Sequence, residues 1–323
     1  MSSTITEEVH LTQSKKHAPI ADLNDNEEEE LRPLRIIWKN IFTFSTAHIL
    51  ALIGLYQFLF VAQWNTCFWA FFLHYFGMFG VTAGAHRLWS HRAYKAKTSV
   101  RAVLMIANTV AYQNDIINWA RDHRCHHKWT DTEADPHNSK RGFFYSHVGW
   151  LLTKKGDALK QAGATVDVSD LFDDPVLVFQ RRHYPSLVLI LCFLLPTAVP
   201  VYFWNERVST AFLVAGMFRY IFTLNSTFLI NSAAHMFGYK PYDASITPTE
   251  SIWTNLQVAG EGGHNYHHTF PQDYRTSEFS VVTNWTRGII EVLARMGLVY
   301  DLKAVSQDAI ERQKLKKGDP HCH

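Results

Sequence analysis

The sequence predicts an all-α integral membrane protein with four transmembrane helices and a cytosolic helical cap that holds a histidine-rich di-metal site. Three observations lead to this fold class. Apolar segments occur in two pairs, and each segment is close to the ~20 residues that cross a bilayer. Lysine and arginine gather on one side of these segments. Nine of the 18 histidines cluster in four short motifs on that same side.

The first pair of predicted helices lies in residues 41–81, a stretch without lysine, arginine, aspartate or glutamate. This stretch is about twice the length of one span, and the polar tripeptide Gln63-Trp64-Asn65 divides it. We therefore expect transmembrane helices at about 37–61 and 66–85.

The second pair is expected at about 186–204 and 208–234, on either side of Asn205-Glu206-Arg207. Arg219 interrupts the last helix, and a charged residue inside a span usually faces the bundle interior or a functional cavity. A soluble protein with buried core helices is the alternative. Two hairpins of near-spanning length are, however, difficult to bury in a chain of 323 residues.

The positions of lysine and arginine predict the orientation. Residues 86–184 hold 15 of them, whereas the short connectors of the two hairpins hold only Arg207. The positive-inside rule places residues 86–184 and both termini on the cytosolic side. Within this stretch, Thr98–Ile117 is expected to form an amphipathic helix at the membrane interface.

Three parts are predicted along the chain. A disordered acidic tail at residues 1–33 precedes the membrane domain at 34–302, and a polar tail follows at 303–323. The net charge of +2 gives no reason to expect binding to nucleic acid. The four cysteines show no paired spacing, which favours a reducing environment.

The clustered histidines have the spacing of metal ligands. Residues i, i+3 and i+4 of a helix share one face, so each HxxHH motif would aim three imidazoles at one place. Nine imidazoles exceed the four ligands of a tetrahedral zinc and fit two metals with four or five nitrogen ligands each. Ligand count alone does not choose among iron, copper, zinc and nickel. The nine are His86, His91, His123, His126, His127, His235, His264, His267 and His268.

Carboxylates near these motifs are candidates for orienting the imidazoles, a role in which a second group accepts the other ring N–H. Helix capping or surface solvation is the alternative for each of them. The candidates are Asp122, Asp131, Glu133, Asp135 and Glu261.

The segment WARDHRCHHKWTDTEADPHNSKRGFFYSHVGWLL, together with TAGAHRLWSH and HNYHH, resembles membrane fatty acyl-CoA desaturases. The similarity is to the stearoyl-CoA, Δ9-type group, with an insect-like character, and it runs from about Pro33 to about Leu302. Membrane hydroxylases share the histidine motifs but not the surrounding sequence.

This resemblance implies that the nine histidines, and Asn231 through a water, hold two iron ions. The di-iron centre would act without a separate side-chain acid or base. Such enzymes convert a saturated acyl-CoA of about C14–C18 into a cis-unsaturated product, using O2 and two electrons. The electrons come from NADH through cytochrome b5 and its reductase, at the endoplasmic reticulum membrane.

The resemblance also implies substrate contacts. The positions that match CoA-binding residues are Asn40, Asn114, Arg121, Asp122, Lys154 and Lys155. The positions that match the acyl tunnel are His74, Met78, Trp119, Thr227 and Phe228. For the lysine pair, a solvated surface is the alternative.

Three positions depart from the family pattern. The bulky Met78 should shorten the tunnel and favour chains of about C14–C16, unless it packs against lipid. Phe228 stands where vertebrate members carry tryptophan. Gly263 replaces a large aromatic residue, which would either open space beside the irons or loosen the entry to the ligand helix.

Other functions stay open at this point. A desaturase of different regiospecificity, such as a Δ11 enzyme of pheromone synthesis, has the same motifs. A di-iron hydroxylase or acetylenase is a second alternative, and a non-catalytic metal-binding membrane protein is a third. Transporters place their ligands near the bilayer midplane, whereas these histidines lie at span ends, which argues against the third.

Overall fold

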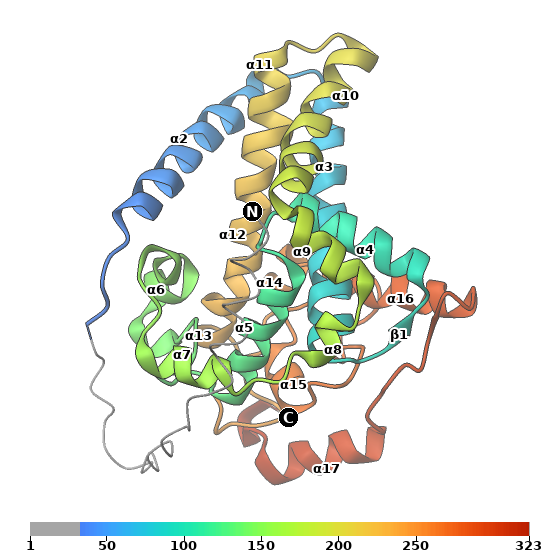
Figure 1. The fold of residues 1–323 in the computed structure, drawn as a ribbon. Coiled ribbons are helices and arrows are strands. Elements are labelled where there is room, and N and C mark those ends of the chain that lie inside the picture. The colour runs from blue at the N-terminus through green and yellow to red at the C-terminus, as the bar shows by residue number, and fades with distance from the viewer. Residues whose placement is uncertain (1–32, 323) are drawn as a thin grey trace. The chain divides into compact units, whose positions relative to one another are not determined.

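The computed structural model describes residues 33–322. The predicted acidic tail lies outside the described residues except for Pro33. The described residues from Leu34 onward form one compact unit, whose regular structure is helical apart from two short strands (Figure 1). Among residues 33–322, four helices are long and apolar enough to cross a membrane, which confirms the predicted fold class. They are Trp38–Phe60, Trp64–Ser90, Pro175–Trp204 and Val208–Met236.

Each span consists of the elements labelled in Figure 1. The first is α2 (Trp38–Phe60), and the second is α3 (Trp64–Phe79) continued by the π-helix η1 (Gly80–Ser90). The third joins α9 (Pro175–Val188), η4 (Leu189–Leu194) and α10 (Leu195–Trp204). The fourth joins α11 (Val208–Ala211), η5 (Phe212–Phe218), α12 (Arg219–Asn231) and α13 (Ala233–Met236).

Two of the predicted helices are shorter than the helices in the structure. The second helix continues past residue 85 to Ser90, and the third begins at Pro175 instead of residue 186. Asp174 caps the third helix by accepting the Val176 N–H, and proline fits the first helical turn. Hydropathy finds the part of a helix that lies in lipid, so it misses the polar turns that extend beyond the membrane.

The helix predicted at Thr98–Ile117 was wrong as one element. The chain forms α4 (Thr98–Ala111) and α5 (Ile116–Lys128) instead. Tyr112 and Asn114 between them adopt left-handed φ angles of 51° and 80°, and Asp115 caps α5 through the Asn118 N–H at 3.2 Å. Asn and Asp are typical of such breaks because they tolerate this conformation and bond to nearby backbone.

Arg219 is buried inside the bundle, as its place in the fourth span predicts. Its guanidinium donates to the carbonyl oxygens of Val110 at 2.6 Å, Cys192 at 2.6 Å and Ala215 at 3.0 Å. These carbonyls belong to α4, η4 and η5 respectively. One side chain thus connects two spans and the short helix α4 through backbone oxygens.

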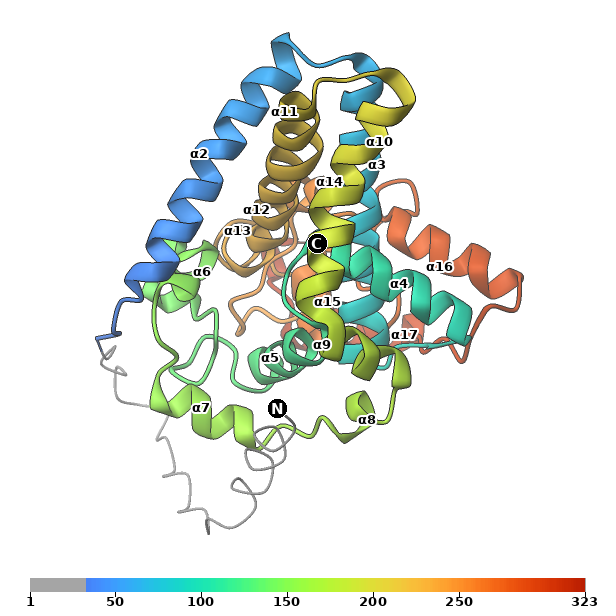
Figure 2. The same ribbon diagram turned by 45° about the horizontal axis from the view of Figure 1, so that its top comes forward.

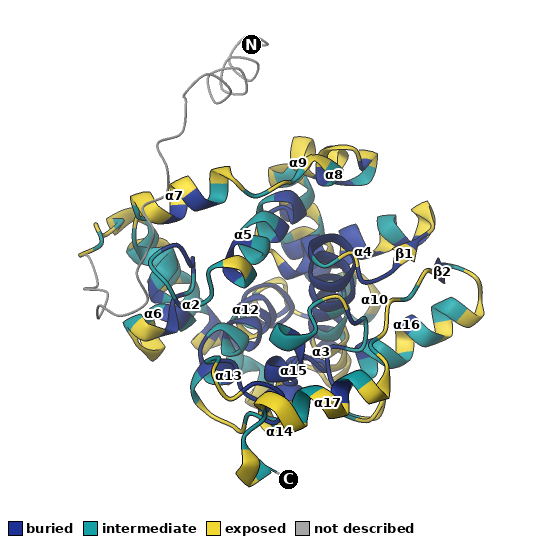
Figure 3. Cartoon of the chain, turned by 90° about the horizontal axis from the view of Figure 1, so that it is seen from below, coloured by how far each residue is buried: buried dark blue, intermediate teal, exposed yellow. Residues whose placement is uncertain are grey.

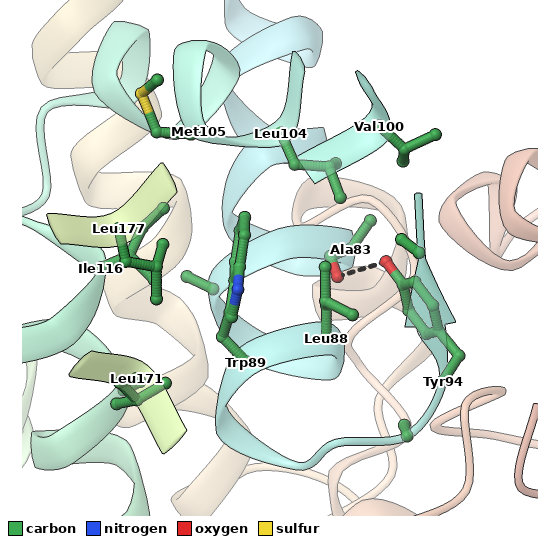
Figure 4. Close-up of a cluster of buried hydrophobic side chains, with 14 of the residues drawn as sticks. Ala83, Leu88, Trp89, Tyr94, Val100, Leu104, Met105, Ile116, Leu171 and Leu177 are labelled. Atoms are coloured by element: carbon green, nitrogen blue, oxygen red, sulfur yellow. Dashed lines mark hydrogen bonds between the residues drawn. The ribbon is translucent and has the colours of Figure 1, made fainter. Parts of the chain in front are cut away.

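The remaining elements form the cap, which we define as residues 91–174 and 237–322. Its largest apolar cluster packs Trp89, Leu104 and Ile116 at the base of the second span (Figure 4). The Tyr94 hydroxyl donates to the Ala83 carbonyl at 2.6 Å, and β1 (Lys95–Ala96) pairs antiparallel with β2 (Val299–Tyr300). The other elements are η2 (Ser139–Arg141), α6 (Phe143–His147), η3 (Gly149–Leu152), α7 (Asp157–Ala164), α8 (Ser169–Phe172), α14 (Ile252–Gln257), α15 (His264–Thr269), α16 (Trp285–Arg295), α17 (Gln307–Lys317) and η6 (Pro320–Cys322).

Figures 1 and 2 show that α2 meets the fourth span near α11 and diverges from α12 toward its own start, while α9 continues into α10. A Cβ on Gly54 of α2 would come within 2.2 Å of the Leu213 carbonyl oxygen. Only glycine therefore permits this close approach of α2 to η5.

The polar segment predicted as a C-terminal tail at 303–323 packs onto the cap. It forms α17, and Ile310 is fully buried against Tyr242 and Tyr266. The Ala244 N–H donates to the Lys317 carbonyl at 2.8 Å. Lys314 and Lys317 also pair with Glu278 and Asp243 of the cap. The compact unit therefore extends past residue 302, which composition could not indicate because polar side chains make most of these contacts.

Candidate metal centre and substrate cavity

The π-helix η1 brings the first two histidines together. Residues five apart are separated by about 1.4 turns of α-helix, but they share a hydrogen bond in a π-helix. The His91 N–H donates to the His86 carbonyl at 3.1 Å, and the two imidazole centroids lie 4.9 Å apart. The spacing HxxxxH thus serves one site because the backbone is π-helical here.

Both HxxHH motifs are helical, in α5 and α15, as their spacing predicts. The prediction that each motif aims at one place was wrong, because each divides its imidazoles between two groups. We name these groups A and B. Group A contains His86, His91, His123, His127 and His267, and group B contains His126, His235, His264 and His268.

Within each group the candidate donor atoms lie within 4.8 Å of one another. In group A, the Nε2 atoms of His86 and His127 lie 2.9 Å from that of His267. In group B, the Nε2 of His264 lies 3.1 Å from that of His235 and 3.2 Å from that of His268. Viewed from the cap side, α15 and α12 lie in the buried centre of the molecule (Figure 3).

Three carboxylates orient these imidazoles through Nδ1. Glu261 accepts from His86 at 3.0 Å, Asp135 from His126 at 2.9 Å and Asp131 from His235 at 2.9 Å. An Nδ1–H that donates to a carboxylate leaves an Nε2 lone pair. In group B, the lone pair of His235 thus points at the nitrogen of His264. Converging imidazole lone pairs with carboxylates behind them are the donor arrangement of a transition-metal site.

Burial keeps most of these imidazoles neutral, as metal ligands must be. Burial, and then the charge of neighbouring imidazoles, lowers the pKa of six histidines well below its usual value. These are His91, His123, His127, His264, His267 and His268. For His126, burial acts in the same direction, but the charge of Asp135 outweighs it and raises the pKa.

Of the five candidate carboxylates, the other two have different partners. Asp122 pairs with Arg121 at 2.9 Å and with Lys155 at 2.6 Å. Glu133 pairs with Arg141 at 2.6 Å. Proximity to a histidine motif in the sequence therefore does not decide which carboxylate holds an imidazole.

Arg87 is a residue of the site that the sequence analysis missed. It is fully buried and donates to Glu261 Oε1 from Nε at 3.1 Å and from Nη2 at 2.9 Å. Burial raises the pKa of Glu261, but the charges of Arg87 and His86 outweigh it and lower this pKa. An arginine directly after His86, at the end of an apolar helix, was the available signal.

Glu250 is a second missed residue. Its Oε1 accepts the Tyr266 N–H at 2.8 Å, at the start of the ligand helix α15. Burial raises the pKa of Glu250 to about 8, so this buried carboxyl is mainly protonated at neutral pH.

Members of groups A and B together line one cavity. His86 and His123 of group A line it, as do His126 and His264 of group B. Asn231 lies in the same wall, at the end of α12. The remaining lining residues are Val81, Thr82, Trp119, Thr227, Ile230, Val258 and Glu261.

The residues expected around the acyl tunnel occupy different places. Trp119 and Thr227 line the cavity, and Trp119 stacks on His123 with ring centroids 5.0 Å apart. Met78 is fully buried behind Thr227, whose hydroxyl lies 3.5 Å from the methionine sulfur. The alternative that Met78 packs against lipid is therefore wrong.

The other two tunnel candidates lie on either side of these residues. His74 bonds to Thr223, one turn before Thr227, at 3.0 Å. Phe228 does not line the cavity and packs edge-on against Trp150 with ring centroids 5.8 Å apart.

The positions expected to contact CoA are brought together only in part. Arg121, Asp122 and Lys155 form one chain of ion pairs at the surface of the cap. Asn40 donates to the Leu151 carbonyl at 2.7 Å. Leu151 lies three residues before Lys154. Asn114 turns its side chain back to the Asp115 N–H.

Gly263 has no open space on its side-chain side. A Cβ there would come within 2.2 Å of Ser277 Cβ and 2.9 Å of the Thr276 carbonyl oxygen. The expectation that this glycine opens space beside the metals was therefore wrong. The glycine is required because residues 276–277 pack directly against the start of α15.

We accordingly expect Gly263→Ala to lower the melting temperature and the amount of bound metal, at an overpacking cost of about 1–3 kcal/mol. Gly163→Ala is the matched control, because nothing lies within 4 Å of its added Cβ and alanine favours a helix by up to about 1 kcal/mol. An unchanged melting temperature for Gly263→Ala would contradict the packing explanation.

Comparison with known proteins identifies the family of the chain. A family model described as fatty acid desaturase matches residues 62–300. The Delta(9)-fatty-acid desaturase fat-6 of Caenorhabditis elegans is 57% identical over 299 residues, covering 93% of this chain and 88% of the relative. The stearoyl-CoA desaturase of Homo sapiens is 50% identical over 283 residues (88% and 79%). The acyl-CoA Delta(11) desaturase of Trichoplusia ni is 50% identical over 289 residues (89% and 82%). The chain therefore belongs to the fatty acid desaturase family.

Proposed function

We propose that the protein is an acyl-CoA desaturase that introduces a cis double bond at the Δ9 position of a saturated C14–C18 acyl-CoA. The observation that carries this proposal is the cavity lined by imidazoles of groups A and B and by apolar side chains such as Val81, Ile230 and Val258. The Δ9 position follows the name of the nematode relative, and the name of the human relative supports a stearoyl-CoA substrate. The Trichoplusia ni relative is the reason to keep Δ11 as the alternative.

The proposed cofactor is a pair of iron ions. Group A would hold one ion, and group B with Asn231 through a water would hold the other. Bound iron would supply the redox chemistry that removes hydrogen from an unactivated methylene, with O2 and two electrons as co-substrates. No side chain is needed as a separate acid or base.

The protein's part is to position one C–C bond and to exclude water. Trp119 and Thr227, which line the cavity, would form part of the wall beside the acyl chain. The CoA group would lie at Arg121, Asp122 and Lys155, with Asn40, Asn114 and Lys154 as further contacts. Once this head group is fixed, the distance along the chain selects the carbons that reach the metals.

The same proposal implies a membrane location and a source of electrons. The lysine- and arginine-rich cap would face the cytosol with both termini, at the endoplasmic reticulum membrane. Electrons would come from NADH through cytochrome b5 and its reductase.

Expression in yeast that lacks its own acyl-CoA desaturase tests the proposal. The protein should restore growth without added unsaturated fatty acid, and gas chromatography–mass spectrometry should locate the new double bond at Δ9. A Δ11 product would correct the position, a hydroxylated or acetylenic product would replace the reaction, and no product from expressed protein would favour a non-catalytic role.

Because Met78 is buried beside the cavity, we predict that its size limits the length of the acyl chain. Met78→Ala should lengthen the tunnel and shift the products toward longer acyl chains, because the removed side chain lies behind Thr227 in the cavity wall. The ratio of chain lengths is the measurement, since truncating a buried methionine also costs about 2–5 kcal/mol of stability.

Leu315→Ala provides the control, because Leu315 is exposed on α17 and its truncation should leave the ratio unchanged. An unaltered ratio for Met78→Ala, with protein present, would remove Met78 from the tunnel.

A further inference from the structure

Three neighbouring parts of the cap expose large apolar side chains that no other described residue covers. Trp253 on α14 is 77% exposed, Val282 before α16 is 85% exposed and Met296 after it is 64% exposed. Contiguous exposed apolar surface usually marks a binding surface. We name this surface the rim patch, and its members are Ile252, Trp253, Leu256, Val282, Val292 and Met296.

The members belong to one continuous piece of structure. The Asn255 side chain of α14 donates to the Thr283 carbonyl at 3.0 Å, next to Val282. Asn284 then caps α16 by accepting the Arg287 N–H at 3.1 Å. Hydrogen bonds therefore hold α14, the Val282 segment and the start of α16 next to one another.

The length of the second span indicates how deep in the membrane the rim patch lies. A hydrocarbon core of ~30 Å corresponds to about 20 helical residues, so a bilayer entered at Trp64 ends at roughly Gly84. Trp285, at the start of α16, packs against Tyr75 and Phe79 with ring centroids 5.4 and 6.2 Å apart. The base of the rim patch therefore reaches the depth of the hydrocarbon edge.

The composition of the patch fits lipid better than water. Residues 252–257 carry no charge. On α16, Val292 and Met296 are exposed beside Arg295. An apolar face bordered by basic residues is typical of helices that lie in the membrane interface. In Figure 1, α16 lies at the foot of the spans near α4, whereas α17 lies at the far end of the cap.

We propose that the rim patch binds the bilayer by inserting α14, Val282 and the outer face of α16 into the cap-side leaflet. The cap would then be held at a fixed depth by more than its four spans. Val258, which follows α14 and lines the cavity, would be separated from lipid by that one helix.

Depth-dependent quenching in phosphatidylcholine nanodiscs tests this. Cys322 is replaced by serine, since Cys67, Cys125 and Cys192 are buried, and a fluorophore is attached to Trp253→Cys or Val282→Cys. Leu315→Cys on α17, where the native side chain is 83% exposed, is the matched control. We expect nitroxide on the upper acyl chain to quench positions 253 and 282 several times more strongly than position 315, and aqueous iodide to show the reverse.

Two results would overturn the proposal. Iodide quenching at 253 and 282 as strong as at 315 would show that water covers the patch. Protection from both quenchers would show that a second copy of the chain covers it. If Trp253→Cys does not yield monodisperse nanodiscs, Met296→Cys gives the same comparison, and none of these readings depends on desaturase activity.

Discussion

Replacing His264 with alanine is expected to abolish the formation of unsaturated fatty acid. His264 is the central member of group B, because its Nε2 faces those of both His235 and His268. Its loss leaves three imidazoles in that group, while group A keeps all five. We expect the purified variant to lose roughly half of its iron, since binding depends on the complete ligand set.

Iron per chain by mass spectrometry and growth of desaturase-deficient yeast are the measurements. His183→Ala is the control, because His183 is exposed on α9 and belongs to neither group. Full iron content and wild-type product from His264→Ala would exclude group B as a metal site.

Among the substitutions proposed for this protein, Glu261→Ala is expected to lower the free energy of unfolding most. It leaves the fully buried Arg87 without its carboxylate, and breaking a buried ion pair costs about 3–5 kcal/mol. It also removes the acceptor that fixes the His86 ring, and loss of such a partner typically lowers metal affinity about 10–100-fold. The melting temperature and the iron affinity should therefore fall together.

Two further variants make this result interpretable. Glu311→Ala breaks an exposed pair with Lys314 and should change stability by less than about 1 kcal/mol. Glu261→Gln keeps an acceptor for His86 but removes the charge, so it should fall between wild type and alanine. A Glu261→Ala protein as stable as Glu311→Ala would show that Arg87 needs no counter-charge.

The sequence predicts what depends on local composition and periodicity. Uncharged apolar length located all four spans, and the i, i+3, i+4 spacing correctly predicted that both HxxHH motifs are helical. Arg219 was expected to face the interior because an exposed charge in lipid is too costly. These inferences need only one segment at a time.

The errors arose where a residue's role depends on distant segments. Each HxxHH motif contributes to both groups. The segment of η1 supplies His86 and His91 to group A, whereas α13 supplies His235 to group B. The sequence of a single motif cannot show this division. The backbone is π-helical between His86 and His91. Hydropathy does not distinguish a π-helix from an α-helix, so it could not predict this turn. Gly263 was misjudged because Ser277, fourteen positions later, fills the space beside it.

The bonds of Arg219 bear on how the chain is assembled. Its three acceptors are carbonyl oxygens, and two of them belong to the third span and to α4. A fourth span that entered lipid alone would carry an unsatisfied guanidinium into the hydrocarbon. We therefore expect the fourth span to be stable in lipid only when it packs against the third span and α4, which supply two of the three acceptors.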